Sequence, residues 1–191
     1  MRTHSYIILY AFVLFTATSF SQKKRLTAVK TGDRMQIDCK LSESIWDSAP
    51  VATDFTMFAP DNGKPISDKT KTEVQVVYTN DAIYIGAKLF DNEPSKMLTE
   101  ITPRDNFGSS ENFGIFLNGF NDGQQDFRFY VSAAGVQADC IFTNQNGEDF
   151  SWDAIWESHI ALTDFGWVVE MKIPYSALRF SKKDIQDWGV N

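Results

Sequence analysis

The sequence predicts an all-β protein folded as a mostly antiparallel β-sandwich, and three observations lead to that prediction. Short runs of residues alternate apolar and polar side chains with the period of two that a half-buried strand shows. Turns rich in Gly, Asn and Asp join these runs. No long helical pattern separates them, which is typical of stacked antiparallel sheets.

The first element lies in the stretch MQIDCKLSESIWDSAP, Met35 to Pro50. Met35 and Ile37 alternate with polar neighbours as in a short strand, and a short helical turn carrying Ile45 and Trp46 follows. A helix this short is not stable alone in water, so its apolar side chains must pack on something larger. We therefore expect Trp46 to close one end of the sandwich as a buried core residue.

The next two runs, residues 72–79 and 82–90, predict a β-hairpin. Asn80 and Asp81 join them, which is a tight-turn signal. Each run has one apolar face, and the two faces together comprise Val74, Val76, Tyr78, Ile83, Ile85, Ala87 and Leu89. We expect this face to point into the sandwich.

The second half of the chain predicts five more strands and one further helical turn. The strands are expected at residues 113–120, 126–133, 136–142, 156–163 and 167–173. Phe127, Phe129 and Val131 share one face of the second of these strands. A short helical turn is expected in PYSALRF, because Pro174 suits the first position of a helix.

The two ends of the chain carry separate predictions. Residues 1–21 combine a basic residue, an apolar run and small residues before Ser21, which is the pattern of a secretory signal peptide. Residues 22–33 are polar and predict a flexible segment, so the folded domain is expected at residues 34–191. The final stretch DWGVN starts a strand pattern at which the chain stops, so we expect the last strand of the sandwich to be truncated.

The charge and cysteine content bear on partners. Asp and Glu number 25 against 18 Lys and Arg, a formal net charge of −7 at pH 7. Binding of nucleic acid requires a cationic surface, so we expect no nucleic acid partner. Export would permit a disulfide between Cys39 and Cys140, and two buried free thiols are the alternative that the sequence leaves open.

Six stretches, taken in order, carry a family pattern: IDCKLSESIWDSAP, VQVVYTNDAIYIGAKLFD, NFGIFLNGFNDG, FYVSAAGVQAD, SWDAIWES and GWVVEMKIPYSALRF. They resemble family 9 carbohydrate-binding modules over roughly residues 34–191. The similar branch places the module at the N-terminus of a long, envelope-associated bacterial protein with a β-rich C-terminal region. The resemblance therefore implies a sandwich that continues into such a region. Cys39 stands where the family turn has Gly, at a position that favours a positive φ.

The resemblance also implies a sugar site in which two Trp residues clamp a terminal sugar, helped by Glu, Gln, Arg and Asn. The first Trp would fall on Phe107 or Gly108, and the Glu would fall on Gly114. The Arg falls near Tyr130, with Arg128 two residues earlier on the same strand, and the Asn falls near Ser132. The second Trp would lie beyond Asn191. The resemblance thus implies that this chain does not reproduce the family's clamp.

A different set of residues offers an aromatic face with polar groups that can pair with sugar hydroxyls. We predict a sugar-binding site formed by Trp152, Asp153, Asp149, Arg104, Asn106 and Arg128. Trp152 is interpreted equally well as a sugar platform or as a cap over Trp156. Trp156 itself begins a strand pattern, and we expect it in the core.

Calcium is a second candidate ligand, because the resemblance implies structural Ca²⁺ and the loop NQNGED supplies hard oxygen donors. The candidates are Asn144, Asn146 and Glu148, with ordinary turn chemistry as the alternative. His159 is the one histidine outside the predicted signal peptide. It lies in a strand pattern and points opposite to Ser158, so a Ser-His-Asp triad has little support. A zinc site is not supported either, because His and Cys ligands are too few.

Three hypotheses follow. The first is an exported, non-catalytic carbohydrate-binding domain that takes part in polysaccharide binding or catabolism in the periplasm or at the outer membrane. Its partner would be an oligo- or polysaccharide. The second is a structural or interaction domain that has kept the fold and lost the sugar site. The third is a part of an O-glycosyl hydrolase, since related modules are often attached to such enzymes.

Overall fold

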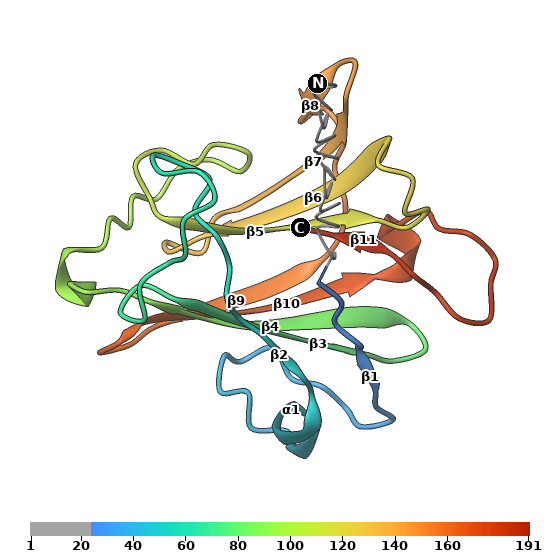
Figure 1. Ribbon diagram of the computed structural model, residues 1–191, viewed down its shortest axis with the longest axis horizontal. Coiled ribbons are helices and arrows are strands. Elements are labelled where there is room, and N and C mark those ends of the chain that lie inside the picture. Colours follow the sequence, from blue (N-terminus) through green and yellow to red (C-terminus); the bar gives the residue numbers. More distant parts are fainter. Residues whose placement is uncertain (1–23) are drawn as a thin grey trace, which may run out of the picture.

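The computed structural model describes residues 24–191, and the predicted signal peptide lies outside them. The described residues form two stacked β-sheets with very little helix (Figure 1). The strands are β1 (Val29–Lys30), β2 (Val51–Ala52), β3 (Thr72–Tyr78), β4 (Ala82–Phe90), β5 (Asn112–Asn118), β6 (Gln125–Ser132), β7 (Gln137–Thr143), β8 (Gly147–Asp149), β9 (Glu157–Leu162), β10 (Gly166–Pro174) and β11 (Gly189–Val190). The helix α1 spans Ser44–Ser48, and 3₁₀ turns lie at Pro94–Lys96 and Tyr175–Ala177. The predicted β-sandwich with short helical turns is confirmed.

The six-stranded sheet is centred on the long strands β4 and β10. Its order is β1-β3-β4-β10-β9, with β2 also paired to β3. β3 and β4 form the predicted hairpin, and Ile85 of β4 pairs with Val76 on one side and Met171 of β10 on the other. All pairs in this sheet are antiparallel except β1 with β3.

The five-stranded sheet has the order β11-β5-β6-β7-β8 and is antiparallel throughout. Phe129 of β6 pairs with Ile115 of β5 and with Asp139 of β7. Every second side chain of these strands, counted from these three residues, therefore lies on the same face of the sheet. Beside β11, the backbone of Asn191 exchanges two hydrogen bonds with Phe116, of 2.8 and 3.1 Å.

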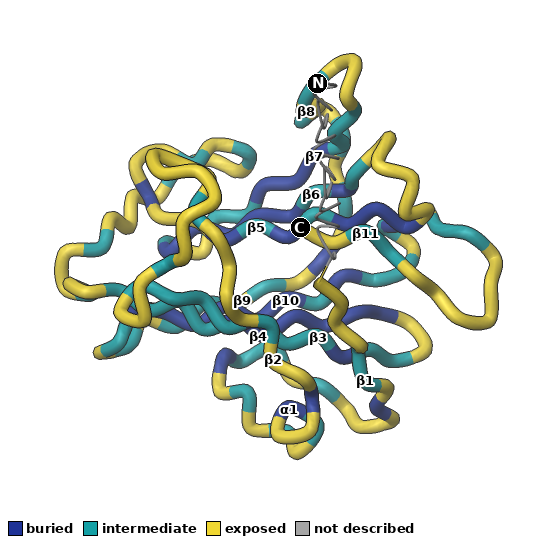
Figure 2. The backbone as a smooth tube through the Cα atoms, viewed as in Figure 1, coloured by how far each residue is buried: buried dark blue, intermediate teal, exposed yellow. Residues whose placement is uncertain are grey.

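The main core lies between the two sheets, where the buried stretches of backbone face each other (Figure 2). Val74, Ile85 and Ala87 from one sheet meet Phe129 and Val131 from the other, as the alternation predicted. Burial of these alternating apolar side chains is the main force holding the layers together.

Trp46 is buried, but not at the end of the sandwich. The helix α1 lies on the side of the six-stranded sheet that faces away from the other sheet (Figure 1). There Trp46, only 3% exposed, packs with Val77 and Tyr84 in a second core. Gly86 of β4 permits this close approach, because a Cβ there would lie 3.3 Å from the Trp46 ring. The expectation of an end plug was wrong because α1 folds onto an outer face.

The turn before α1 is anchored by Glu170 of β10. Its Oε2 accepts the backbone N–H groups of Asp38 and Cys39, both at 2.9 Å, and its side chain is fully buried. Cys39 has φ 60°, the positive value that the family turn favours. Cys39 and Cys140 are both buried free thiols.

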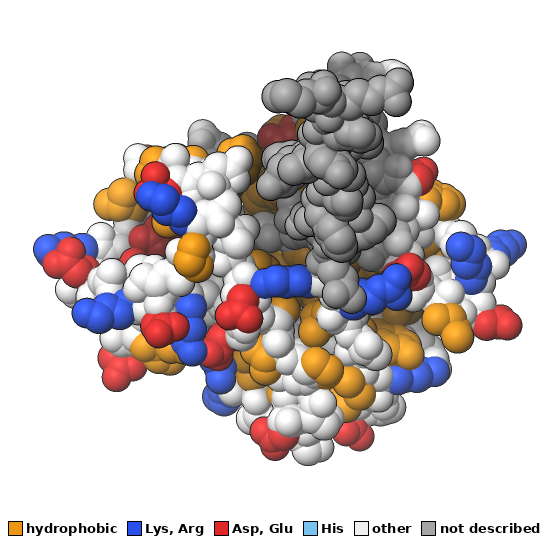
Figure 3. Space-filling view, in the orientation of Figure 1, with side chains coloured by type: hydrophobic (Ala, Val, Ile, Leu, Met, Phe, Trp, Pro, Cys, Tyr) orange, Lys and Arg blue, Asp and Glu red, His pale blue; other side chains and the backbone are white. Residues whose placement is uncertain are grey.

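Lys and Arg lie among Asp and Glu over the described surface seen in Figure 3, instead of gathering in one patch. Within residues 24–191, no helix has the length and apolarity needed to cross a membrane.

Candidate functional site

β8 pairs only with the end of β7, from Ile141 to Thr143, so the edge of β7 is open over its first residues. Two loops wrap around this open edge and carry most of the residues that the sequence singled out. One loop, residues 97–111, leads into β5, and the other, residues 150–156, follows β8. Each loop crosses the edge. Phe107 and Phe150 pack on the outer face of the five-stranded sheet, whereas Arg104 and Trp152 lie on the inner side. The loops therefore shape both a seam between the sheets and an outer face.

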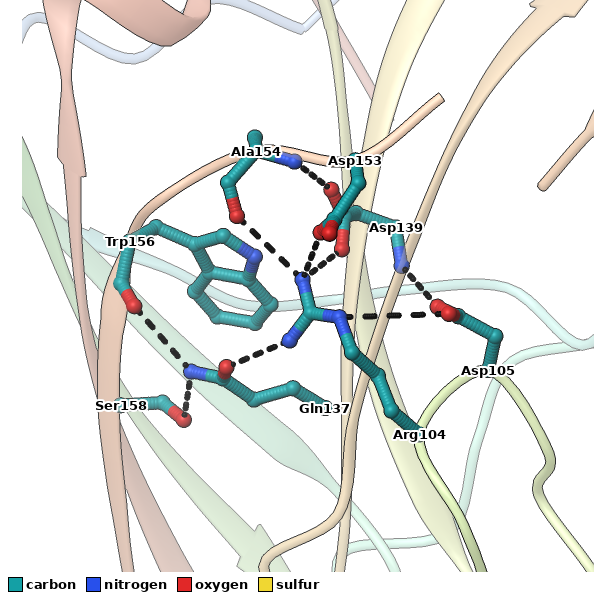
Figure 4. A network of polar contacts seen from close by, with 8 residues as sticks. All are labelled: Arg104, Asp105, Gln137, Asp139, Asp153, Ala154, Trp156 and Ser158. Atoms are coloured by element: carbon teal, nitrogen blue, oxygen red, sulfur yellow. Dashed lines mark hydrogen bonds and ion pairs between the residues drawn. The ribbon is translucent and has the colours of Figure 1, made fainter. Parts of the chain in front are cut away.

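Arg104 is the centre of a polar network at the seam (Figure 4). Its guanidinium donates to Gln137 Oε1 at 2.8 Å, to Asp153 Oδ1 at 2.9 Å and to Asp139. The Asp139 side chain is fully buried, and the Arg104 side chain is 34% exposed. The ion pair thus compensates a carboxylate that has no access to water.

Burial raises the pKa of the Asp139 carboxyl, and Ala154 and Arg104 are the main neighbours that oppose that shift. The backbone N–H of Ala154 donates to Asp139 Oδ2 at 2.6 Å, and Arg104 supplies positive charge. These partners tie the second loop to β7, so the network acts as a clasp that joins both loops to the sheet.

Asp105 protects the open edge of β7 in the same place. Its backbone N–H donates to the carbonyl of Gln137 at 3.1 Å, and its Oδ1 accepts the N–H of Asp139 at 3.2 Å. Asp105 adopts φ 65°, a conformation that Asp tolerates better than most residues. The residue replaces a missing neighbouring strand, which satisfies backbone groups that would otherwise invite edge association.

Gln137 connects the two sheets across this seam. Its Nε2 donates to Ser158 Oγ at 2.9 Å and to the carbonyl of Trp156 at 3.4 Å. Trp156 is 6% exposed and packs against Phe129, as expected of a core residue. The polar side chains of the clasp thus form their hydrogen bonds with one another, which favours a structural role for the clasp.

The outer face of the five-stranded sheet has a different character. Tyr130 lies beneath a set of aromatic rings, with ring centroids 5.1 Å from Phe107 and 5.4 Å from Phe116. Phe150 extends the set, 6.3 Å from Phe107. Tyr130 is buried, whereas the three Phe residues are half-buried. We refer to this surface, completed by Arg128, Phe142 and Glu148, as the aromatic face.

Arg128 is stacked between two rings of the aromatic face. Its guanidinium carbon lies 4.3 Å from the Phe116 centroid and 3.7 Å from the Phe142 centroid. It donates to Glu148 Oε1 at 2.9 Å and to Asp126 Oδ2 at 3.3 Å. Stacking and ion pairing together hold this planar group in one orientation.

Glu148 joins Arg128 to Tyr130. The Tyr130 hydroxyl donates to Glu148 Oε1 at 2.7 Å, the same oxygen that accepts from Arg128. Burial, and secondarily this carboxylate, raise the pKa of Tyr130, so the phenol is neutral at physiological pH. The second oxygen of Glu148 is left to accept hydrogen bonds from outside.

Three positions that the resemblance assigns to sugar binding meet on the aromatic face. Gly114 pairs in register with Tyr130, and Phe107 covers Tyr130. A Cβ on Gly114 would lie 2.7 Å from the Tyr130 ring, so the tyrosine fills the space that a larger residue would need. Ser132 is the last residue of β6, and its Oγ accepts the backbone N–H groups of Ala134 and Val136 in the turn that follows.

The six residues predicted to bind sugar do not form one cluster. Arg104 and Asp153 meet in the clasp, and Arg128 lies on the aromatic face. The carboxylate of Asp149 accepts from Ser151, which lowers the pKa of Asp149, and Asn106 caps the N–H of Gly108. Both contacts are local to their loops.

Trp152 is half-buried rather than turned to solvent as a platform. Its ring lies 5.3 Å from Phe127 and 6.0 Å from Phe129 on the inner side of β6. The loop after β8 crosses the edge of β7 and fills the open end of the core with this ring. The position therefore fits the alternative that the sequence left open, a tryptophan that caps the core.

The calcium candidates lie around the β7–β8 turn. Asn146 and Glu148 line a surface cavity of about 420 Å³ together with Asp149, and the Asn144 amide donates to the carbonyl of Gly123. Glu148 Oε1 is already engaged by Arg128 and Tyr130. Within residues 24–191, no group of three His, Cys, Asp or Glu residues is placed to hold a metal. Calcium binding stays a prediction that these contacts do not favour.

Sequence reasoning missed most of the aromatic face. A signal existed in the strand alternation, because the positions opposite the core are not simply polar. The non-core positions of β5, β6 and β7 carry Phe116, Arg128, Tyr130, Cys140 and Phe142. When neighbouring strands carry apolar residues at the outward-facing positions as well as the inward-facing ones, both faces of the sheet are packed.

Comparisons with known proteins agree with this fold. A family model described as "Carbohydrate family 9 binding domain-like" matches residues 37–190. A family 9 carbohydrate-binding module from Caldicellulosiruptor kristjanssonii, solved with cellotriose, superposes with a TM-score of 0.58 at 18% identity, over 87% of this chain and 74% of that chain. The same kind of module from that organism, solved with glucose, gives 0.57 at 17% identity, over 87% and 75%. No curated protein matches.

Proposed function

Because the chain belongs to the carbohydrate family 9 binding domain-like family, we propose that it binds oligo- or polysaccharide through the aromatic face. The observation that carries this proposal is the combination of half-buried rings, each partly accessible at the surface, with an ordered acceptor. Sugar rings pack their C–H faces on aromatic side chains, while hydroxyl groups pair with polar groups that are held in place. Phe107, Phe116 and Phe142 supply the first property, and Glu148 supplies the second.

The proposed role is binding and not catalysis. The pair of Glu148 and Arg128 is committed to mutual hydrogen bonds, and burial keeps Tyr130 in its neutral form. The aromatic face thus presents fixed polar groups without a proton donor or nucleophile aimed at a bound sugar. An attached glycoside hydrolase would supply the chemistry if the domain takes part in polysaccharide catabolism.

We further propose that the domain is exported and works in the periplasm or at the outer membrane, in continuity with a β-rich envelope region. The support is the signal-peptide pattern of residues 1–21 and the resemblance to an envelope-associated branch. Mass measurement of the protein purified from the cell envelope tests export. A mature protein that retains Met1 would contradict it.

A second candidate is a structural or interaction domain that has lost sugar binding. Tyr130 favours it, because its ring occupies the space over Gly114 where the resemblance places a sugar-contacting Glu. The two candidates differ in one measurable property, the affinity of the protein for glycans.

Glycan-array screening of the protein, followed by titration calorimetry on the best ligand, separates them. We expect Phe142→Ala to weaken binding about tenfold or more, since one stacking ring is lost. Phe58→Ala is the matched control, because Phe58 is a phenylalanine that is 86% exposed outside the aromatic face. Absence of glycan binding in the wild type would favour the interaction domain, and unchanged binding by Phe142→Ala would reject this face as the site.

A further inference from the structure

One edge of the six-stranded sheet is open along β9, its outermost strand. The backbone N–H of Thr163 donates to the carbonyl of Gly166 at 2.9 Å, so the backbone groups of Thr163 point toward β10. These directions alternate along a strand, and the backbone groups of Ser158, Ile160 and Leu162 therefore point away from β10. Within residues 24–191, none of them has a hydrogen-bond partner.

Elsewhere at the seam the protein occupies its own edge groups. Asp105 bonds the backbone of β7, and Gln137 donates to the carbonyl of Trp156 just before β9 begins. β9 itself, with the sequence ESHIAL, contains no Lys, Arg or Pro, and the side chains that it turns toward the core carry no charge. Edge strands use such residues to avoid pairing with another chain, so this edge is free to pair.

Exposed apolar side chains lie at both ends of this edge. Leu162 ends β9 and is 57% exposed, and Ile155, just before the strand, is 92% exposed. An antiparallel second copy of β9 would bring the end of one strand beside the start of the other. Each Leu162 would then lie toward Ile155 of the second copy, and one contact would remove both side chains from water.

From these observations we propose that two copies of this chain pair through β9, antiparallel and centred on Ile160, so that their six-stranded sheets become continuous. In this register Ile160 lies opposite Ile160 of the second copy, and Ser158 lies opposite Leu162. Residues with edge-facing groups thus oppose one another, and each such pair exchanges two hydrogen bonds. The pair closes on itself with the twofold symmetry that is commonest among homodimers.

The charges of β9 favour this register over a parallel one. The antiparallel register places Glu157 opposite Thr163 of the second copy, and His159 opposite Ala161. A parallel, in-register pair would instead place the two Glu157 carboxylates side by side, which is destabilising. The strand is therefore complementary to a second copy of itself in the antiparallel orientation.

The proposed symmetry has a consequence for recognition. The twofold axis is perpendicular to the joined sheet, so both five-stranded sheets lie on the same side of it. The two aromatic faces would point the same way, and one polysaccharide could engage both. Dimer formation itself does not rest on the proposed function, and it is tested without a ligand.

Sedimentation velocity of the protein over a range of concentrations tests the proposal. A contact along one short strand is smaller than a standard interface, so we expect a weak dimer with a dissociation constant of about 10–100 µM. Leu162→Lys places a charge on the edge and should raise this constant at least about tenfold. Ile185→Lys, at a side chain that is 86% exposed outside β9, is the matched control and should leave it unchanged.

Cysteine cross-linking tests the register. Ile160→Cys puts two thiols on the twofold axis, where paired Cα atoms lie about 5.5 Å apart, a separation that a disulfide spans. Leu162→Cys is the control, because its two thiols would lie about 13 Å apart along the strands. Cys39 and Cys140 are buried. Mild oxidation should therefore give a covalent dimer of Ile160→Cys and not of Leu162→Cys.

Three results would overturn the proposal and leave sugar binding untouched. The first is a wild-type protein that stays monomeric up to about 1 mM, well above the expected dissociation constant. The second is a dimer that Leu162→Lys weakens no more than Ile185→Lys does. The third is a covalent dimer of Leu162→Cys without one of Ile160→Cys. Circular dichroism of each variant confirms that it is folded.

Discussion

The outer faces of the two sheets are covered in opposite ways. On the six-stranded sheet, residues 35–49 fold back so that Trp46 and Tyr84 are buried in a second core. On the five-stranded sheet, the covering groups are half-buried side chains of the sheet and two loops, Phe107 and Phe116 among them. The first face is closed by the chain itself, whereas the second remains accessible at its surface.

This difference separates stability from recognition within one small fold. A face closed by a folded segment contributes burial of apolar area, because its side chains have left water. A face of half-exposed rings contributes less to stability and keeps apolar contact area available for a ligand. Substitutions on the two faces should therefore have unlike effects.

The largest expected effect is on the closed face. Trp46→Ala should lower the free energy of unfolding by about 3–5 kcal/mol, because it leaves a cavity between α1 and the sheet. Urea denaturation followed by circular dichroism measures it. Phe58→Ala, at an exposed site, should cost no more than about 0.5 kcal/mol. Similar costs for the two variants would show that residues 35–49 do not close the face.

The clasp beside the aromatic face should respond next. Arg104→Ala leaves the fully buried Asp139 carboxylate without its cation, and we expect a loss of about 2–4 kcal/mol of stability. Asp153→Asn is the matched control, since Asp153 touches the same guanidinium but is 72% exposed. It should cost less than about 1 kcal/mol. If both variants unfold at the wild-type urea concentration, the clasp does not hold the two loops.

The closed face should also make stability depend on pH. Burial raises the pKa of Glu170 from 4.5 to about 7, with Glu43 and Asp38 adding to the shift while two backbone N–H groups oppose it. The folded state then binds more protons than the unfolded state between these values, so this contribution to stability is lost as pH rises from about 4.5 to 7.

Glu170→Gln isolates that contribution. The variant should match wild type near pH 4.5 and exceed its free energy of unfolding by about 2–3 kcal/mol at pH 8. Chemical denaturation at a series of pH values gives the difference between the two proteins. A constant difference across the series would contradict the assignment to Glu170.

The smallest expected effect is on the aromatic face. Arg128→Lys removes the planar group between Phe116 and Phe142, and lysine cannot replace its stacked, forked geometry. Glycan affinity should fall about tenfold, while stability changes by less than about 1 kcal/mol. Arg179→Lys is the control for the exchange itself, because Arg179 donates only to backbone carbonyls beside the 3₁₀ turn Tyr175–Ala177. A large loss of stability in Arg128→Lys would mark this face as structural.

Much of the fold could be predicted from the sequence because strand alternation is local. The positions of Val74, Ile85 and Phe129 in the core follow from a period of two that the chain displays within each strand. The burial of Trp156 followed from its place at the start of such a run. The site was harder, since Arg104 and Asp153, which were predicted together, meet in a clasp, while Arg128 belongs to another face.

The sequence by itself determined the two-layered β class and the apolar side of each long strand, because successive side chains of a strand must point to opposite faces. Only the tertiary structure decided that Trp46 covers an outer face, that both edge loops cross β7, and that Tyr130 fills the space over Gly114. These features depend on contacts between segments far apart in the chain. Their energies arise only when the strands have paired in register and the layers have packed.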